Sequence, residues 1–171
     1  MANRDDSLND IFLPGGQLRP ELLDTGAARA LEQALRLAGE TRWDNVRSPH
    51  IFMGLLAQPD PGVRNWGERL DADLPTLLGQ FQELFEQQDG EAEPLLLLNR
   101  EFLSNNVIQL LRDAHQRATD NGRRCITAMD LLISLFTAPN STVAECFERA
   151  GYTAAKVTEL AVMAEQHARR S

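Results

Sequence analysis

The residues that could carry chemistry in this chain are few and far apart. The three histidines, His50, His115 and His167, show no metal-ligand spacing, and Cys125 and Cys146 show neither metal nor redox spacing. The sequence predicts that both cysteines are reduced thiols facing the core. No Gly-Lys-Ser/Thr phosphate-binding motif and no recognisable nucleophile–histidine arrangement is present. We therefore expect no catalytic residue, no bound metal and no cofactor.

Composition narrows the class of partner. The chain has 171 residues, 25 of them acidic and 17 basic, with a net charge of −8. Nucleic acids and anionic membranes both require a concentrated basic face, so we expect neither as a partner and favour an unfolded or basic polypeptide. Apolar runs such as residues 95–98 are too short to cross a bilayer, and residues 1–13 lack the apolar segment of a signal peptide. These features predict a cytoplasmic location.

Helix signals must supply the framework for any binding site. No window alternates polar and apolar residues for long enough to predict a strand, so the predicted fold class is all-α. Residues 1–20 read as an irregular arm closed by Pro20. Helices are then predicted from their caps and apolar periodicity. The eight starts are Asp24 or Thr25, Ser48 with Pro49 as first helical residue, Val63, Asp73, Ser104 or Asn105, Thr127, Ser141 and Thr153.

The second half of the chain repeats the first at an offset of 80 residues without a gap. Between residues 24–73 and 104–153, the identical pairs are Leu31/Leu111, Ala34/Ala114, Ala38/Ala118, Leu55/Leu135, Pro59/Pro139, Val63/Val143, Glu68/Glu148 and Arg69/Arg149. A repeat of this size is one supersecondary unit. We predict two pseudo-twofold four-helix repeats, 24–86 and 104–167, joined by a linker at 87–103. Together they form one domain, 21–168, that follows the arm 1–20.

The spacing within each unit resembles the Clp amino-terminal repeat of the Clp/Hsp100 unfoldases and disaggregases. In the first unit the motif is an Ala34-x3-Ala38 helix followed by Val46, three spacers, His50 and an aliphatic helix. The second unit keeps this shape with Asp130 in place of the histidine, and residues 150–157 are most similar to the disaggregase branch. The resemblance implies a double Clp-N domain without catalysis that captures substrates or adaptors for an AAA+ ring through surface grooves.

The resemblance also implies which residues border such a groove. Asp24 and Asp130 occupy positions that are acidic at the groove edge of the disaggregase branch. Arg124 stands where that branch is acidic, which is expected to change the preferred peptide charge. Trp43, in the polar loop 40–45, is either an exposed anchor for a partner or a packed residue. We predict Asp24, Trp43, Arg124 and Asp130 as the residues that bind a peptide or partner.

The branch that recognises phosphorylated arginine carries a glutamate before each motif histidine. Here Pro49 and Met129 stand at those two positions. An apolar pair does not neutralise a guanidinium, so phosphoarginine is not the expected ligand.

The predicted function is a protein-interaction module that is monomeric as an isolated domain and binds substrate or adaptor polypeptide for, or docks on, a Clp/Hsp100 AAA+ ATPase. Two alternatives stay open: a stand-alone accessory or structural protein of a Clp protease assembly, and an enzyme whose His50 and Asp130 converge across the pseudo-twofold axis. The simpler interpretation of His50 is a structural histidine, and that of Asp130 is a first-turn carboxylate that complements the helix dipole. Trp66 is predicted to lie in the core.

Overall fold

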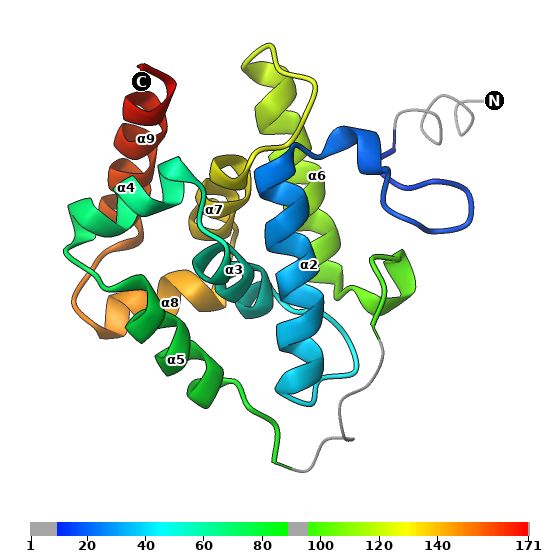
Figure 1. Ribbon diagram of the computed structural model, residues 1–171, viewed down its shortest axis with the longest axis horizontal. Helices are drawn as coiled ribbons and strands as arrows, with labels where there is room; N and C mark the ends of the chain where they lie inside the picture. Colours follow the sequence, from blue (N-terminus) through cyan, green and yellow to red (C-terminus); the bar gives the residue numbers. More distant parts are fainter. Residues whose placement is uncertain (1–9, 89–95, 171) are drawn as a thin grey trace.

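A computed structural model describes residues 10–88 and 96–170. Eight α-helices and two short 3-10 turns follow one another in this part of the chain, which has no strand (Figure 1). The all-α, eight-helix prediction is confirmed. The elements are η1 (Pro20–Leu22), α2 (Thr25–Glu40), α3 (Ser48–Ala57), α4 (Pro61–Leu70), α5 (Leu74–Leu84), η2 (Arg100–Phe102), α6 (Asn105–Asp120), α7 (Ala128–Thr137), α8 (Thr142–Arg149) and α9 (Ala154–Arg170).

Most helices begin where their caps predict. The side chains of Asp24, Asp73 and Ser104 each accept a hydrogen bond from the backbone three residues later. Two starts differ from the prediction. The α3 helix has Arg47 as its N-cap and Ser48 as its first residue. The α4 helix begins at Pro61 rather than Val63, because Asp60 caps it and a proline fits the first turn.

The two repeats are locked together by reciprocal backbone bonds. The segment before α2 pairs with the loop before α7, and the segment before α6 pairs with the loop before α3. Asp24 N donates to Ile126 O at 3.0 Å, and its partner at offset 80, Ser104 N, donates to Val46 O at the same 3.0 Å. The η1 and η2 turns are also 80 residues apart. This exchange of equivalent bonds is the signature of a pseudo-twofold axis between the two units.

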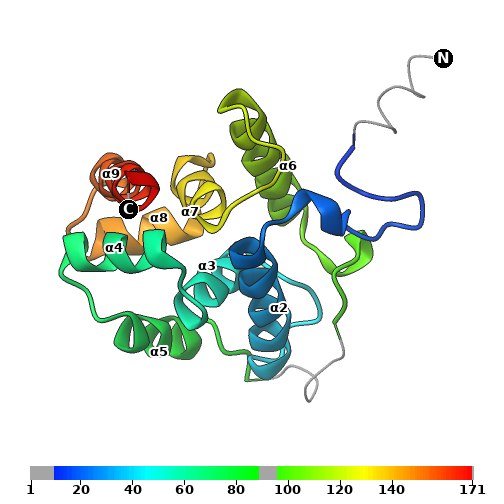
Figure 2. The ribbon, with the colours of Figure 1, turned by 45° about the horizontal axis from the view of Figure 1, so that its top comes forward.

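The core lies around the apolar helices α3 and α7. Trp66 has no exposed surface and donates from Nε1 to Val157 O at 3.2 Å, which confirms it as a core residue. Its ring contacts Phe52, Phe136 and Phe147, which come from both repeats. Beside this cluster α4 packs across α9 (Figures 1 and 2). The two units therefore share one core.

The arm is attached to the linker and, through the ion pair between Asp10 and Arg112 at 3.4 Å, to α6 of the second repeat. Ile11, Phe12 and Leu18 are buried, and the arm turns back on itself through the bond from Leu13 N to Gln17 O at 2.8 Å. Leu18 N also donates to the carbonyl of residue 98 at 3.2 Å. Residues 1–9 of the expected arm and 89–95 of the expected linker lie outside the described residues.

The prediction that both cysteines face the core is correct for Cys146 and wrong for Cys125. Both are half-buried and free of disulfide bonds. Cys146 packs against the core, whereas Cys125 lies in the loop before α7, where its Sγ donates to Glu21 O at 3.4 Å. In the described part of the chain, no helix combines the length and the apolar character needed to span a membrane.

His50 is sealed within the first repeat. It has no exposed surface, its Nδ1 accepts from Arg47 N at 2.9 Å, and its Nε2 lies 3.2 Å from Thr41 Oγ1. Burial, followed by the charge of Arg47, lowers the pKa of His50 to about 4. The imidazole is therefore neutral at neutral pH and serves as a first-turn cap of α3.

The buried imidazole predicts a pH dependence of stability. The unfolded chain protonates this histidine below about pH 6.5 and the folded chain only near pH 4, so stability should fall as the pH drops through that interval. Replacing His50→Asn keeps an acceptor in the first turn but removes the titration. The free energy of unfolding, measured with urea between pH 4 and 7, should then depend less steeply on pH, by up to about one proton. His115→Asn, at a half-buried site on α6, is the matched histidine replacement outside this buried cap. An equal pH dependence of stability in wild type and His50→Asn would refute the conclusion that His50 is held neutral in the folded chain.

Candidate functional site

The ends of four helices meet around one groove. It has a volume of about 250 Å³ and lies where α2, α4 and α7 begin and α9 approaches its end. Its lining residues are Asp24, Asp60, Pro61, Gly62, Arg123, Thr127, Met129, Glu165, Ala168 and Arg169. We call it the Asp24–Asp60 groove. Three helix N-termini and five charged side chains thus surround a single concave surface.

Two carboxylates stand side by side on this groove. Asp24 accepts from Ala27 N and Asp60 accepts from Val63 N, both at 2.8 Å. Between them, a Cβ on Gly26 would lie 3.5 Å from Asp60 Cβ and 3.6 Å from Asp24 Oδ1. Neither carboxylate forms an ion pair within the described residues.

The electrostatics of this pair favour a cation. Burial is the main cause that raises the pKa of Asp60, and the neighbouring charge of Asp24 adds to it. Arg64 and two backbone N–H groups oppose this shift without cancelling it. A positive group placed between the two carboxylates would relieve their repulsion.

Arg123 and Glu165, which line the groove, belong to a four-charge network. Arg117 forms ion pairs with Asp130 at 2.7 Å and with Glu165 at 2.8 Å, and Arg123 pairs with Asp130 at 2.6 Å. Asp130 has no exposed surface and also closes a capping box with Thr127 at the start of α7. Two guanidiniums and two carboxylates balance to zero charge. They join α6, the loop before α7, α7 itself and α9.

The ionic network sets the direction in which the pKa of Asp130 departs from its usual value. Burial raises it, but hydrogen bonds from Arg123, from the Thr127 backbone and from Arg117 outweigh burial and hold the pKa below its usual value. The carboxylate is therefore ionised at neutral pH. It orients Arg123, whose side chain lines the groove.

The structure separates the four predicted site residues. Asp24 lies on the groove. Asp130 lies beneath its wall and borders it only through Arg123, while Arg124 is exposed next to Arg123 but does not line the groove. Trp43 belongs to the first repeat, away from the groove. It is half-buried, and its Nε1 donates to the carbonyl of Phe85.

The network occupies positions that are apolar or aromatic in the first repeat. Arg117, Arg123, Asp130 and Glu165 correspond at offset 80 to Leu37, Trp43, His50 and Phe85. There the Trp43 and His50 rings pack at 5.5 Å. Equivalent positions therefore hold an ionic cluster in the second repeat and packed rings in the first.

The enzyme alternative requires His50 and Asp130 to converge. His50 bonds to Arg47 and Thr41, whereas Asp130 bonds to two arginines and Thr127. No hydrogen bond joins the two residues in the described structure. Among the described residues there is also no group of three or more histidines, cysteines and carboxylates placed to hold a metal ion.

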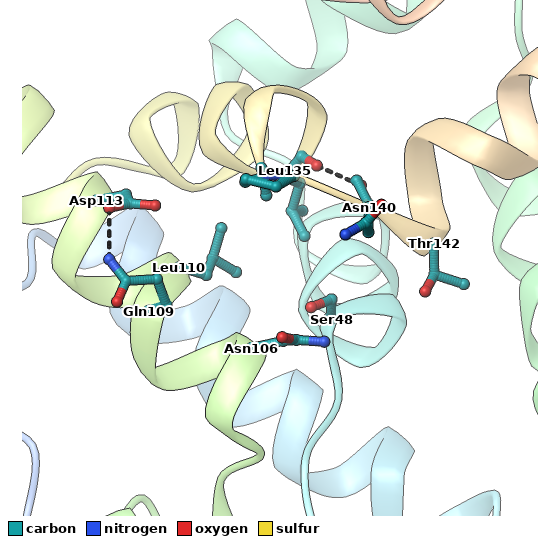
Figure 3. A pocket seen from close by; sticks show the side chains of 11 residues that line it. Ser48, Asn106, Gln109, Leu110, Asp113, Leu135, Asn140 and Thr142 are labelled. Carbon is teal, nitrogen blue, oxygen red and sulfur yellow. Dashed lines mark hydrogen bonds between the residues drawn. The ribbon is translucent and has the colours of Figure 1, made fainter.

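A smaller groove of about 60 Å³ shares three lining positions with the Asp24–Asp60 groove at offset 80 (Figure 3). Asn140, Ser141 and Thr142 stand there at the positions of Asp60, Pro61 and Gly62. Figure 3 shows Asn106, Gln109 and Asp113 of α6 facing Ser48, Asn140 and Thr142. Asp113 accepts from Gln109 at 2.9 Å. The second groove therefore combines polar and apolar lining residues with the single charge of Asp113, in contrast to the charged Asp24–Asp60 groove.

Sequence reasoning missed several groove residues. Asp60 could have been found, because Asp60-Pro61 is a cap followed by a proline in the first turn. The sequence marks Met129 only by its departure from the phosphoarginine pattern. Glu165 gave no local signal, since its place on the groove depends on how α9 packs against α7.

Comparison with known proteins places the fold. No family model matches the chain, and no curated protein matches it in sequence. Among solved structures, the N-terminal domain of ClpV1 from E. coli has a TM-score of 0.65 at 19% identity over 96% of this chain and 93% of that one. The N-terminal domain of ClpD from Arabidopsis thaliana has a TM-score of 0.65 at 16% identity over 85% and 96% of the chains. That of Hsp104 from Candida albicans reaches 0.66 at 14% identity over 82% and 89%.

These similarities define the class of fold. The chain has the fold of the N-terminal domains of Clp/Hsp100 ATPases, and the resemblance seen in its repeats is confirmed at that level. A complex of a ClpV N-domain with a VipB peptide is also similar, with a TM-score of 0.55 at 18% identity over 69% of each chain.

Proposed function

We propose that this chain is a protein-interaction module that binds segments of substrate or adaptor polypeptide for, or docked on, a Clp/Hsp100 AAA+ ATPase. We propose further that it performs no catalysis, works as a monomeric domain in the cytoplasm, and has neither nucleic acid nor membrane as a partner. The Clp amino-terminal fold supports the proposal, as does the ClpV N-domain solved with a peptide.

The observation that carries the proposal is the pair of carboxylates on the Asp24–Asp60 groove. A lysine or arginine side chain placed between them would form charge-assisted hydrogen bonds in a partly desolvated site. Met129 and Pro61 supply apolar surface beside them. The preferred segment therefore carries a basic residue next to an aliphatic one.

The two alternative functions, an accessory protein and an enzyme, are supported to different degrees. An accessory or structural protein of a Clp assembly would use the same groove, so it differs in partner and not in chemistry. An enzyme with a His50/Asp130 site has no support, because both side chains are fully buried and bonded to separate partners.

Neutralising the two carboxylates should abolish most of the binding. Fluorescence polarisation with a labelled peptide of alternating leucine and arginine should show a Kd at least about tenfold higher for Asp24→Asn/Asp60→Asn than for wild type. Asparagine retains the capping oxygen, so the helices are expected to stay intact. Asp73→Asn is the matched control, because it neutralises the α5 cap outside the groove.

Two outcomes would refute the groove as the binding site. One is an unchanged Kd for the double variant. The other is equal binding of a control peptide with glutamate in place of arginine. The wild-type Kd should also rise with ionic strength, because salt screens the attraction between the charges.

A further inference from the structure

An apolar slot lies on a different face of the domain, between α5 and α8. Its volume is about 180 Å³, and its lining is almost wholly apolar. The lining residues are Leu77, Gln80, Phe81, Leu84, Cys146, Phe147 and Ala150. Leu84 is 61% exposed, the most exposed large apolar side chain in the described part of the chain. Neither α5 nor α8 contributes to the Asp24–Asp60 groove.

The pseudo-twofold axis relates this slot to a closed interface. In the other half of the domain, the equivalent helices α9 and α4 pack directly against each other (Figures 1 and 2). At offset 80 the slot residues Leu77, Phe81, Leu84, Cys146 and Ala150 correspond to Val157, Ala161, Ala164, Trp66 and Leu70. All five counterparts are buried. The same positions thus form a sealed contact in one half and an open slot in the other.

One residue accounts for much of the difference. Trp66 fills the space between α4 and α9 and bonds to Val157 O, whereas α8 has the much smaller Cys146 at that position. The aromatic residue of α8 stands one position later, at Phe147, and its ring contacts Phe52 and Phe136 in the shared core. The slot therefore lacks a large side chain that its counterpart contains.

The charge around the slot selects the kind of partner. Glu83, Glu86 and Glu148 are exposed on or next to the two helices, whereas Glu145 is neutralised by its ion pair with Arg149 at 2.9 Å. Apart from this neutral pair, the exposed charged residues on α5 and α8, here called the rim, are acidic. A second copy of the chain would bring two acidic rims together, whereas a basic segment would complement the charge.

We propose that the α5–α8 slot is a second docking surface, which takes a basic helical segment of a partner protein that inserts a large aromatic side chain beside Cys146. The inserted ring takes the place that Trp66 fills in the repeat-related interface. Leu84 and Phe81 then cover the ring, and the rim glutamates pair with lysine or arginine on either side of it. This surface goes beyond the proposed function, which rests on the other groove.

The test uses a labelled lysine-rich 16-residue helical peptide with one central tryptophan, and a matched peptide with alanine in its place. For the full chain, the tryptophan peptide should bind about 30-fold more tightly, the effect of a hot-spot aromatic residue. Cys146→Trp should remove this preference by filling the slot. Leu84→Ser, at an exposed site that leaves the fold unperturbed, should weaken binding about fivefold or more. Leu97→Ser is its matched control, because Leu97 is a similarly exposed leucine, 55%, outside the slot.

The outcomes separate this surface from the other groove. Asp24→Asn/Asp60→Asn should keep the preference for the tryptophan peptide over the alanine peptide, because that preference comes from the slot alone, so failure of one site leaves the other testable. The slot proposal is overturned if both peptides bind equally or if Leu84→Ser matches Leu97→Ser. It is also overturned if sedimentation equilibrium shows a dimer that Leu84→Ser dissociates, because the occupant would then be a second copy.

Discussion

Replacing Asp130→Ala is expected to lower the free energy of unfolding by about 3–5 kcal/mol, because it breaks a buried ionic cluster by removing one partner. Arg117 and Arg123 would lose the carboxylate that both contact, and α7 would lose its capping box. Glu165 would remain as the only acidic partner of the two guanidiniums within the described network. The urea midpoint of unfolding measures this loss.

The matched control is an exposed ion pair. Glu145→Ala removes the carboxylate that pairs with Arg149 at 2.9 Å on the surface of α8, where both side chains are mostly exposed. Solvent and salt screen such a pair, so the midpoint should barely move. Equal shifts for Asp130→Ala and Glu145→Ala would show that the network does not hold α7 and α9 together.

Gly54→Ala is expected to cost about 3 kcal/mol, at the upper end of ordinary overpacking. A Cβ at this position would lie 2.1 Å from Ala30 O and 3.0 Å from Ala34 N. Both are backbone atoms of α2, so no side chain can rotate away and the two helices must separate. Thermal unfolding of the variant should show a correspondingly lower Tm.

Gly79→Ala is the control for this glycine. It lies within α5 and a Cβ there would meet nothing within 4 Å, so alanine should stabilise the protein by about 0.5–1 kcal/mol through its higher helix propensity. The close approach of α2 and α3 would be disproved if both alanine variants shifted Tm in the same direction by similar amounts.

The helices were predictable from the sequence because their signals are local. Asp24, Asp73 and Ser104 cap helices within three residues of their own positions, and the offset of 80 residues exposed the repeat directly. The buried tryptophan could likewise be predicted from its place on an apolar helix face. The reciprocal bonds between the repeats could not be read from these local signals, but they follow from the same symmetry.

The site was less predictable because tertiary packing assembles it. Asp130 gave the signal of an ordinary first-turn acid, yet its burial depends on Arg117 from α6 and on α9, which brings Glu165 to the same cluster. Asp24 was predicted from the resemblance. Its neighbour on the groove, Asp60, lies at the start of a different helix of the same repeat, so their contact is not a local signal. The difference between the closed α4–α9 interface and the open slot rests on side-chain volume at equivalent positions, which periodicity does not report.

The most direct test of the account is a map of where polypeptide binds. Titrating ¹⁵N-labelled protein with the leucine–arginine peptide should shift the amide resonances of Asp24, Gly62 and Met129, which line one groove from three different helix starts. The shifts should saturate together and disappear in the Asp24→Asn/Asp60→Asn variant. Shifts confined to α5 and α8, or saturable binding that leaves the groove amides unmoved, would contradict the proposal that this groove captures polypeptide.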